Sequence, residues 1–83
     1  MIINKKFNKE TIDKLKSYGF KMEYNIMKKS YGQILLVLDF ADREIGVCKV
    51  EVKDFYLEFS KFEEISNEIG HQVAILKLEG LIK

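Results

Sequence analysis

The chain has 83 residues, of which 47% are hydrophobic and 33% charged, and this composition allows one hydrophobic core but excludes a second domain. Fourteen basic and 13 acidic residues give a formal net charge of +1, which excludes the strongly basic footprint of most nucleic-acid-binding domains. No apolar run approaches the roughly 20 residues that a membrane span needs, and residues 1–7 lack the apolar core of a signal peptide. We therefore expect a single compact domain over residues 1–83 in the cytoplasm, with no membrane partner.

The first helix has recognisable boundaries. Asn8 precedes a run of polar and apolar residues at helical spacing and is a preferred N-cap, and Phe7 and Ile12 stand at the two positions of a hydrophobic staple. Gly19 suits the left-handed position that follows a helix. The sequence therefore predicts a helix over Lys9–Tyr18.

Three strands are predicted next, because the apolar residues change to a period of two. The first covers residues 20–26, with apolar side chains at every second position, and a turn over residues 30–32 follows it. The second covers residues 33–40 and is apolar on both faces. After a hairpin loop at residues 41–46, alternation resumes over residues 47–53. These segments predict a three-stranded antiparallel meander.

The aromatic stretch that follows has two interpretations. If the strand ends at Lys53, then Asp54 is the N-cap of a helix that Gly70 terminates, and its core face is made by Phe55, Phe59, Phe62, Ile65 and Ile69. If the strand continues to Phe59 through a bulge, the helix begins at Ser60 instead, with a capping box between Ser60 and Glu63. We prefer the first interpretation, because it needs no bulge.

Residues 73–78 are predicted to form a final strand, with Val73 and Ile75 on one face and Ala74, Leu76 and Leu78 on the other. The fold class is then α+β, a single small domain with the order α-β-β-β-α-β, in which two helices pack on the meander and the C-terminal strand. A right-handed crossover through the second helix would make the last strand parallel to the first and third, with a sheet order of 3-2-1-4.

No residue pattern supports catalysis, a metal or a cofactor. His71 is the only histidine and Cys48 the only cysteine, and the two could in principle form a catalytic pair of base and nucleophile. We prefer the interpretation that His71 is an exposed loop residue and that Cys48 is a buried thiol of the core. Asp39, Asp42 and Glu44 surround one hairpin but lack the spacing of a calcium loop, and polar turn chemistry explains them. We expect no enzyme activity.

Nucleic-acid binding is an alternative that the charge distribution raises. Residues 1–31 carry eight lysines and three acidic residues, whereas residues 32–83 carry six basic and ten acidic residues. Lysines near tyrosines could hold a single strand by charge and stacking, and the candidates are Lys16, Lys21, Lys28 and Lys29. The single arginine, Arg43, argues against this reading, because arginine supplies the bidentate contacts to bases and phosphates.

Two features favour a protein partner. Glu64 and Glu68 lie one turn apart on the second predicted helix with Glu63 beside them, which gives a negative ridge. Leu35 and Val37 occupy the sheet face opposite that of Ile34, Leu36 and Leu38. Either the helices therefore cover both faces of the sheet, or one apolar face is left for a partner or for a homodimer.

The prediction is therefore a non-catalytic protein-binding module. Residue types with AT-rich codons are abundant, arginine occurs once and proline and tryptophan are absent, a composition that we associate with AT-rich bacterial or phage genomes. More narrowly, we predict an inhibitor or accessory protein of a phage or mobile element that occupies a surface of a bacterial host defence complex. The alternatives are single-stranded nucleic-acid binding and a small-ligand-binding homo-oligomer.

Overall fold

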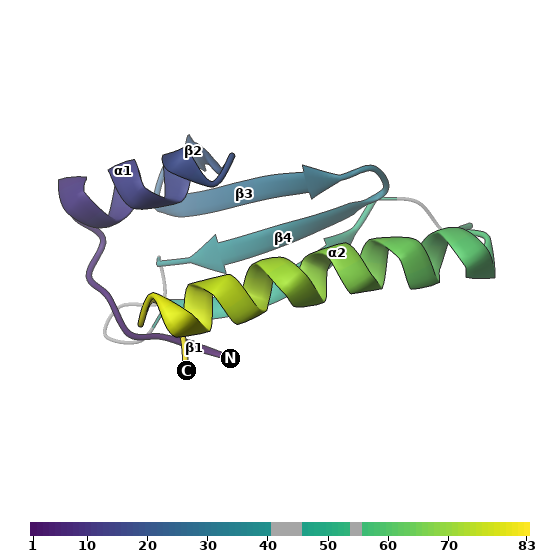
Figure 1. Ribbon diagram of the computed structural model, residues 1–83. Helices are drawn as coiled ribbons and strands as arrows, with labels where there is room; N and C mark the ends of the chain where they lie inside the picture. The colour runs from purple at the N-terminus through teal and green to yellow at the C-terminus, as the bar shows by residue number, and fades with distance from the viewer. Residues whose placement is uncertain (41–45, 54–55) are drawn as a thin grey trace.

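The computed structural model describes residues 1–40, 46–53 and 56–83 (Figure 1). In chain order its elements are β1 (Ile2–Ile3), α1 (Lys9–Ser17), β2 (Lys21–Glu23), β3 (Ile26–Tyr31), β4 (Ile34–Asp39), β5 (Gly46–Val52) and α2 (Phe59–Leu78). The predicted α+β class is confirmed, and the described residues form two helices and a five-stranded antiparallel sheet. Within the described residues, no helix is both long and apolar enough to cross a lipid bilayer.

The sheet has the order β1-β5-β4-β3-β2, and each neighbouring pair is antiparallel. The second and third predicted strands correspond to β4 and β5, whereas the first predicted strand, residues 20–26, covers β2 and reaches only the first residue of β3. The first predicted strand is wrong in extent, because the chain turns at Tyr24, whose φ of 56° lies in the left-handed region, and residues 26–31 then form β3. β3 therefore includes residues 30 and 31, which were predicted to form a turn.

The boundaries of α1 agree with the sequence to within one residue. The Asn8 side-chain oxygen accepts a hydrogen bond from the backbone N–H of Thr11 at 3.0 Å, as an N-cap should. Gly19 has a φ of +94°, which is strained for any residue with a Cβ, so the helix ends where glycine permits the left-handed turn.

The second helix differs most from the prediction. It runs for 20 residues from Phe59 to Leu78, so Gly70 does not end it and the predicted strand at residues 73–78 is wrong. Leu76 is completely buried whereas Leu78 is 88% exposed, although a strand would place both on one face. The predicted start at Asp54 lies outside the described residues. The sheet order 3-2-1-4 and its parallel crossover are also wrong, because every strand pair is antiparallel.

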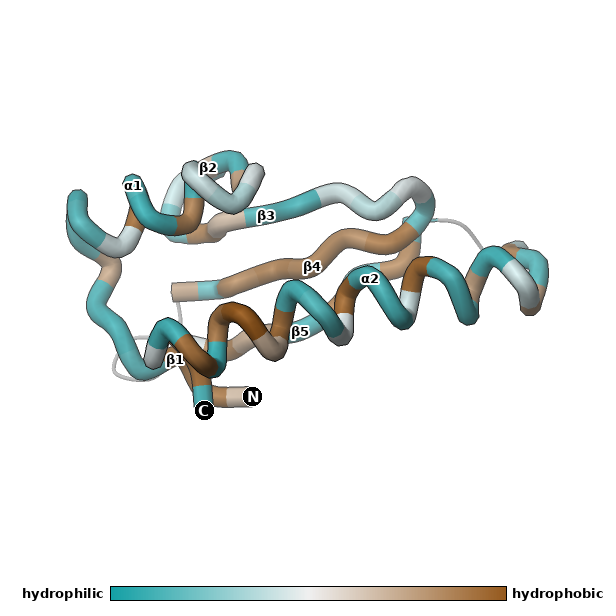
Figure 2. Tube along the Cα trace, viewed as in Figure 1, coloured by the Kyte–Doolittle hydropathy of each residue, from teal (hydrophilic) through white to brown (hydrophobic). Residues whose placement is uncertain are grey.

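Both helices pack on one face of the sheet. Leu15 of α1, Leu76 of α2 and Leu36 and Leu38 of β4 belong to one buried cluster, and the Lys14 and Glu79 side chains join the two helices at 3.4 Å. Figure 2 shows β4 as an apolar strand that runs between β3 and α2 in this view. The two ends of the chain meet at β1, where Ile3 bridges Ile82 (Figure 1).

Candidate functional site

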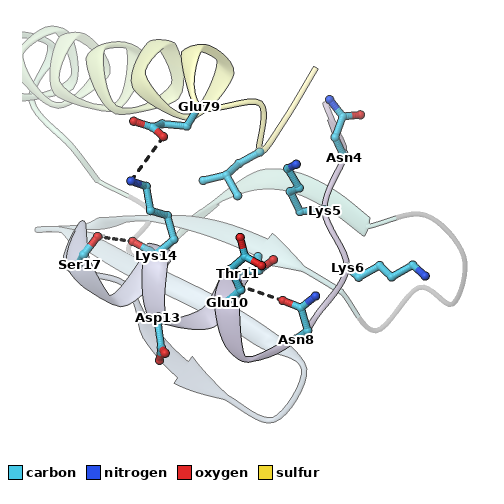
Figure 3. A pocket seen from close by; sticks show the side chains of 11 residues that line it. Asn4, Lys5, Lys6, Asn8, Glu10, Thr11, Asp13, Lys14, Ser17 and Glu79 are labelled. Atoms are coloured by element: carbon cyan, nitrogen blue, oxygen red, sulfur yellow. Dashed lines mark hydrogen bonds and ion pairs between the residues drawn. The ribbon is translucent and has the colours of Figure 1, made fainter.

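A polar hollow of about 760 Å³ lies between the N-terminal segment, α1 and the end of α2 (Figure 3). Its main interaction is the ion pair between Lys14 and Glu79, and this carboxylate raises the pKa of the Lys14 ammonium. Lys5 and Lys6 come from the N-terminal segment, and neither a cysteine nor a histidine lines the hollow. The lining therefore combines charged groups with the hydroxyls of Thr11 and Ser17.

The candidate catalytic residues are not brought together. Cys48 is buried in the core, and this burial raises the pKa of its thiol. His71 is exposed on α2 and precedes Leu76 by five residues, which places it about 140° around the helix from that buried side chain. Among the described residues, no three potential metal ligands form a group; Asp42 and Glu44 lie outside that part of the chain, and Asp39 pairs with Lys49 at 3.5 Å.

The lysines proposed for nucleic-acid binding do not form one surface. Lys21 and Lys28 are opposite each other on the sheet face that carries no helix, and the Lys28 ammonium lies 3.5 Å from Glu23. Lys29 points to the helix-covered face, where its Nζ donates a hydrogen bond to Gln72 Oε1 at 2.6 Å. Lys16 lies on α1. The four side chains therefore cannot follow one nucleic-acid backbone together.

The residues proposed for partner binding occupy two opposite sides of the molecule. Leu35 is half-buried and Val37 is buried on the sheet face without a helix. Lys28 and Lys49 are the cross-strand neighbours of Val37, and their aliphatic stems are long enough to cover it. The three acidic side chains are exposed on α2, which covers the other sheet face: Glu63, Glu64 and Glu68. A single compact partner could not contact both sets.

The outer edge of β5 is open over its second half. Cys48 N–H donates to the carbonyl of Met1 on the β1 side at 2.8 Å, whereas Lys53 N–H donates to the carbonyl of Gln33 on the β4 side at 2.8 Å. Backbone direction alternates along a strand, so the N–H and C=O groups of Val50 and Val52 point to the β1 side. Within the described residues β1 pairs with no residue of β5 other than Gly46 and Val47, and Met1 reaches Cys48. In the part of the chain that the structure describes, the outward backbone groups of Val50 and Val52 are therefore unpaired.

Apolar side chains gather near this open edge. Val50 and Val52 are each 55% exposed on the helix-facing side of the sheet, and Phe59 is 74% exposed at the start of α2. The first turn of α2 extends past the turn between β3 and β4, so this turn has no strand beneath it (Figure 1). We call the exposed apolar set the apolar end; its members are Val50, Val52, Tyr56, Phe59 and Phe62.

The prediction that Phe59 and Phe62 belong to the core is wrong, because both are exposed. Phe55 lies outside the described residues. The spacing of the phenylalanines indicated one helix face correctly, but it could not reveal that the first turn of α2 extends beyond the sheet. Nor could any local pattern identify β5 as a strand with a half-open edge, because that depends on how far β1 reaches.

Comparisons of the chain with protein-family models, with curated proteins and with solved structures find no match.

Proposed function

We propose that this chain is a non-catalytic protein-binding module that holds an extended segment of another protein as an additional strand along β5. The observation that carries the proposal is the open edge at Val50 and Val52, where four backbone hydrogen-bonding groups point outward beside exposed apolar side chains. Strand addition is a common way to recognise a peptide, because the main chain supplies affinity and alternate side chains supply specificity. The narrower prediction of an inhibitor of a host defence complex rests on composition and size.

The side chains of β5 define the segment that would fit. Lys49, Glu51 and Lys53 alternate with Val50 and Val52, so charged groups lie on one side of the edge and apolar groups on the other. Opposite charges directly across a strand pair stabilise it, and like charges destabilise it. The matching segment therefore reads acidic, apolar, basic, apolar, acidic, and its apolar residues would extend the apolar end.

A second copy of β5 fits the edge less well. A two-fold axis at Glu51 would set this carboxylate against its own copy and Lys49 against Lys53, so every charged pair would be repulsive. An axis at Val50 would set Val52 against Cys48, whose outward N–H already donates to Met1. An axis at Val52 would set Glu51 against Lys53, which is an attractive pair. Among the described residues, however, only Val52 would then form backbone hydrogen bonds with the second copy. A segment of another protein is therefore the favoured occupant.

A peptide titration tests this proposal. The probe is a synthetic peptide whose central five residues are glutamate, valine, lysine, valine and glutamate, and the matched control reverses the charges to lysine, valine, glutamate, valine and lysine. We expect the backbone amide signals of Val50 and Val52 to shift in NMR spectra, with an affinity about tenfold higher for the first peptide because three charge pairs change sign. Equal affinities, or shifts confined to other strands, would overturn the proposal.

Variants of Val52 separate the backbone contribution from folding. Val52→Pro removes an N–H that points away from β4, and an edge strand tolerates proline at such a position, so the sheet should form but the peptide should no longer bind. Val52→Thr keeps the N–H and the strand preference, and it should bind. A light-scattering mass completes the test: a dimer that Val52→Pro converts to a monomer would show that a second copy, not a different protein, occupies the edge.

A further inference from the structure

One flank of α2 faces β3. Lys29 and Tyr31 of β3 line a hollow of about 440 Å³ together with Glu68 and His71 of α2. Glu68 lies about 80° around the helix from Leu76, the completely buried side chain that marks the side of α2 against the sheet. Because β4 and β5 follow β3 in the sheet, the opposite flank of α2 faces β5.

Phe62 belongs to this opposite flank. It lies about 40° around α2 from Leu76, on the other side of Leu76 from Glu68. Ile69 and Val73 follow it on the same flank, and both pack against the core cluster. Phe62 has a similar direction around the helix but is 48% exposed. Its ring is therefore only partly covered by the residues that the structure describes.

The second half of β5 is uncovered on the same side of the sheet. Val50 and Val52 are each 55% exposed there, whereas their cross-strand partners on β4 are almost completely buried: Leu36 is 1% exposed and Ile34 is 3% exposed. The helix layer therefore covers β4 but not these two valines. An exposed apolar surface remains on β5 beside the flank of α2 that carries Phe62.

The start of α2 lies at the Val52 end of β5. A Cβ at Gly32 would be 3.9 Å from the Ile65 side chain of α2. Gly32 belongs to the turn that leads into Ile34, which is the cross-strand partner of Val52. Phe62 precedes Ile65 by three residues, so it is nearer to the end of β5 than to its middle.

The size of this surface bears on the side chains of an added strand. Each valine of β5 would have one residue of the added strand directly opposite, with its side chain on the helix-facing side. An aliphatic side chain there would cover the neighbouring valine, whereas a phenylalanine or tyrosine ring extends several bonds further toward α2. A pair of aromatic rings is stabilised beyond the area that it buries, so contact with the Phe62 ring favours an aromatic residue.

The direction of the added strand follows from the backbone groups. Val50 and Val52 each offer an N–H and a C=O on the outer side, and in an antiparallel pair one residue bonds both groups of the valine opposite it. Antiparallel pairing is also the more stable per residue, and the described strands pair only in this way. The first apolar residue of an antiparallel segment lies opposite Val52 and the second opposite Val50.

We propose that the segment held along β5 runs antiparallel to it and carries an aromatic side chain opposite Val52, with the ring between Val52 and Phe62. This inference rests on the proposed function, and it makes Phe62 the residue that selects the segment. Phe59 has no such role, because it lies about 100° around α2 from Leu76 and is 74% exposed.

Three peptides test the inference by NMR titration. The first is the peptide with glutamate, valine, lysine, valine and glutamate at its centre; the second has phenylalanine in place of the first valine, and the third has phenylalanine in place of the second. The second peptide should bind about tenfold more tightly than the first, and the third should gain less than about threefold. Nuclear Overhauser contacts should join the ring of the second peptide to Val52 and Phe62. Equal gains for the two phenylalanine peptides, or a larger gain for the third, would overturn the inference.

Three variants test the role of Phe62. Phe62→Ala should remove the gain of the second peptide over the first, and Phe62→Leu, which keeps an apolar side chain for folding, should reduce it to about threefold. Phe59→Ala is the matched control, because it removes an exposed ring of the same helix, and it should keep the gain. A gain that survives Phe62→Ala, or one that is lost in Phe59→Ala, would refute this role.

The same titrations separate this inference from the proposed function. If the first peptide shifts the amide signals of Val50 and Val52 but neither phenylalanine peptide binds more tightly, the inference fails and the proposed function stands. If no peptide shifts these signals, both fail.

Discussion

Replacing Gln72 by leucine should stabilise the protein, although it removes a hydrogen bond. The unpartnered Nε2 costs about 1–3 kcal/mol, which leucine would recover. The hydrogen bond that is lost, from Lys29 to Gln72 Oε1, is charge-assisted. Lys29 is only half-buried, however, so water can hydrogen-bond its ammonium in place of Gln72. Its Nζ also keeps its position 5.4 Å from the centre of the Tyr31 ring. The net gain is about 1 kcal/mol, or roughly 4–8 °C in Tm for a domain of this size.

Thermal and urea unfolding followed by circular dichroism would measure this gain. Gln72→Glu is the contrasting variant, since it keeps an acceptor for Lys29 but puts a carboxylate oxygen in the buried place of Nε2, and it should therefore be less stable than Gln72→Leu. A Gln72→Leu protein that is destabilised by more than about 1 kcal/mol would refute the reasoning. That outcome would mean that Nε2 has a strong partner in the free protein, such as a buried water.

Three further experiments test the packing. Leu76→Ala should cost about 2–5 kcal/mol of stability whereas Leu78→Ala should change it by less than about 0.5 kcal/mol, and equal losses would favour the strand assignment. A Cβ at Gly46 would lie 2.8 Å from the Ile3 side chain of β1, so Gly46→Ala should destabilise the protein by about 1–3 kcal/mol in urea unfolding. A Cβ at Gly70 would meet open space, so Gly70→Ala should stabilise it by about 0.5–1 kcal/mol. Burial raises the pKa of the Cys48 thiol above its ordinary value of 9.0, so iodoacetamide should modify the native protein far more slowly than the unfolded chain. The free energy of unfolding should also decline as the pH rises above 9.0, because the thiol then ionises readily only in the unfolded chain.

Elements with strong local signals could be predicted from the sequence. Asn8 and Gly19 mark the two ends of α1 by side-chain and backbone preferences that act within a few residues, and the structure contains both features. The apolar alternation of β4 and β5 likewise indicates strands directly. The two-residue strand β1 has no such signal, because its pairing with Gly46 and Val47 depends on contacts more than 40 residues away.

The C-terminal half of α2 could not be predicted from local pattern. Residues 73–78 contain valine, isoleucine and leucine in an order that suits either a strand or a buried helix. Gly70 costs a helix about 0.5–1 kcal/mol, which tertiary packing readily exceeds when Leu76 is completely buried. The same limitation misplaced His71, which was predicted to lie in a loop, because only the continued helix brings it to the hollow that Lys29 and Tyr31 also line.

The helical state of residues 73–78 also determines which part of the sheet is free. As a strand, this segment would have paired with a sheet edge, but as helix it covers one sheet face and leaves the edge of β5 to β1 alone among the described residues. Water can hydrogen-bond the outward groups of Val50 and Val52 at little cost, so the stability of the isolated chain does not require a partner there. The exposed apolar area beside them is different, because only a further chain can bury it. The affinity of any segment at this edge must therefore depend on its apolar residues, whereas its charged residues select the register.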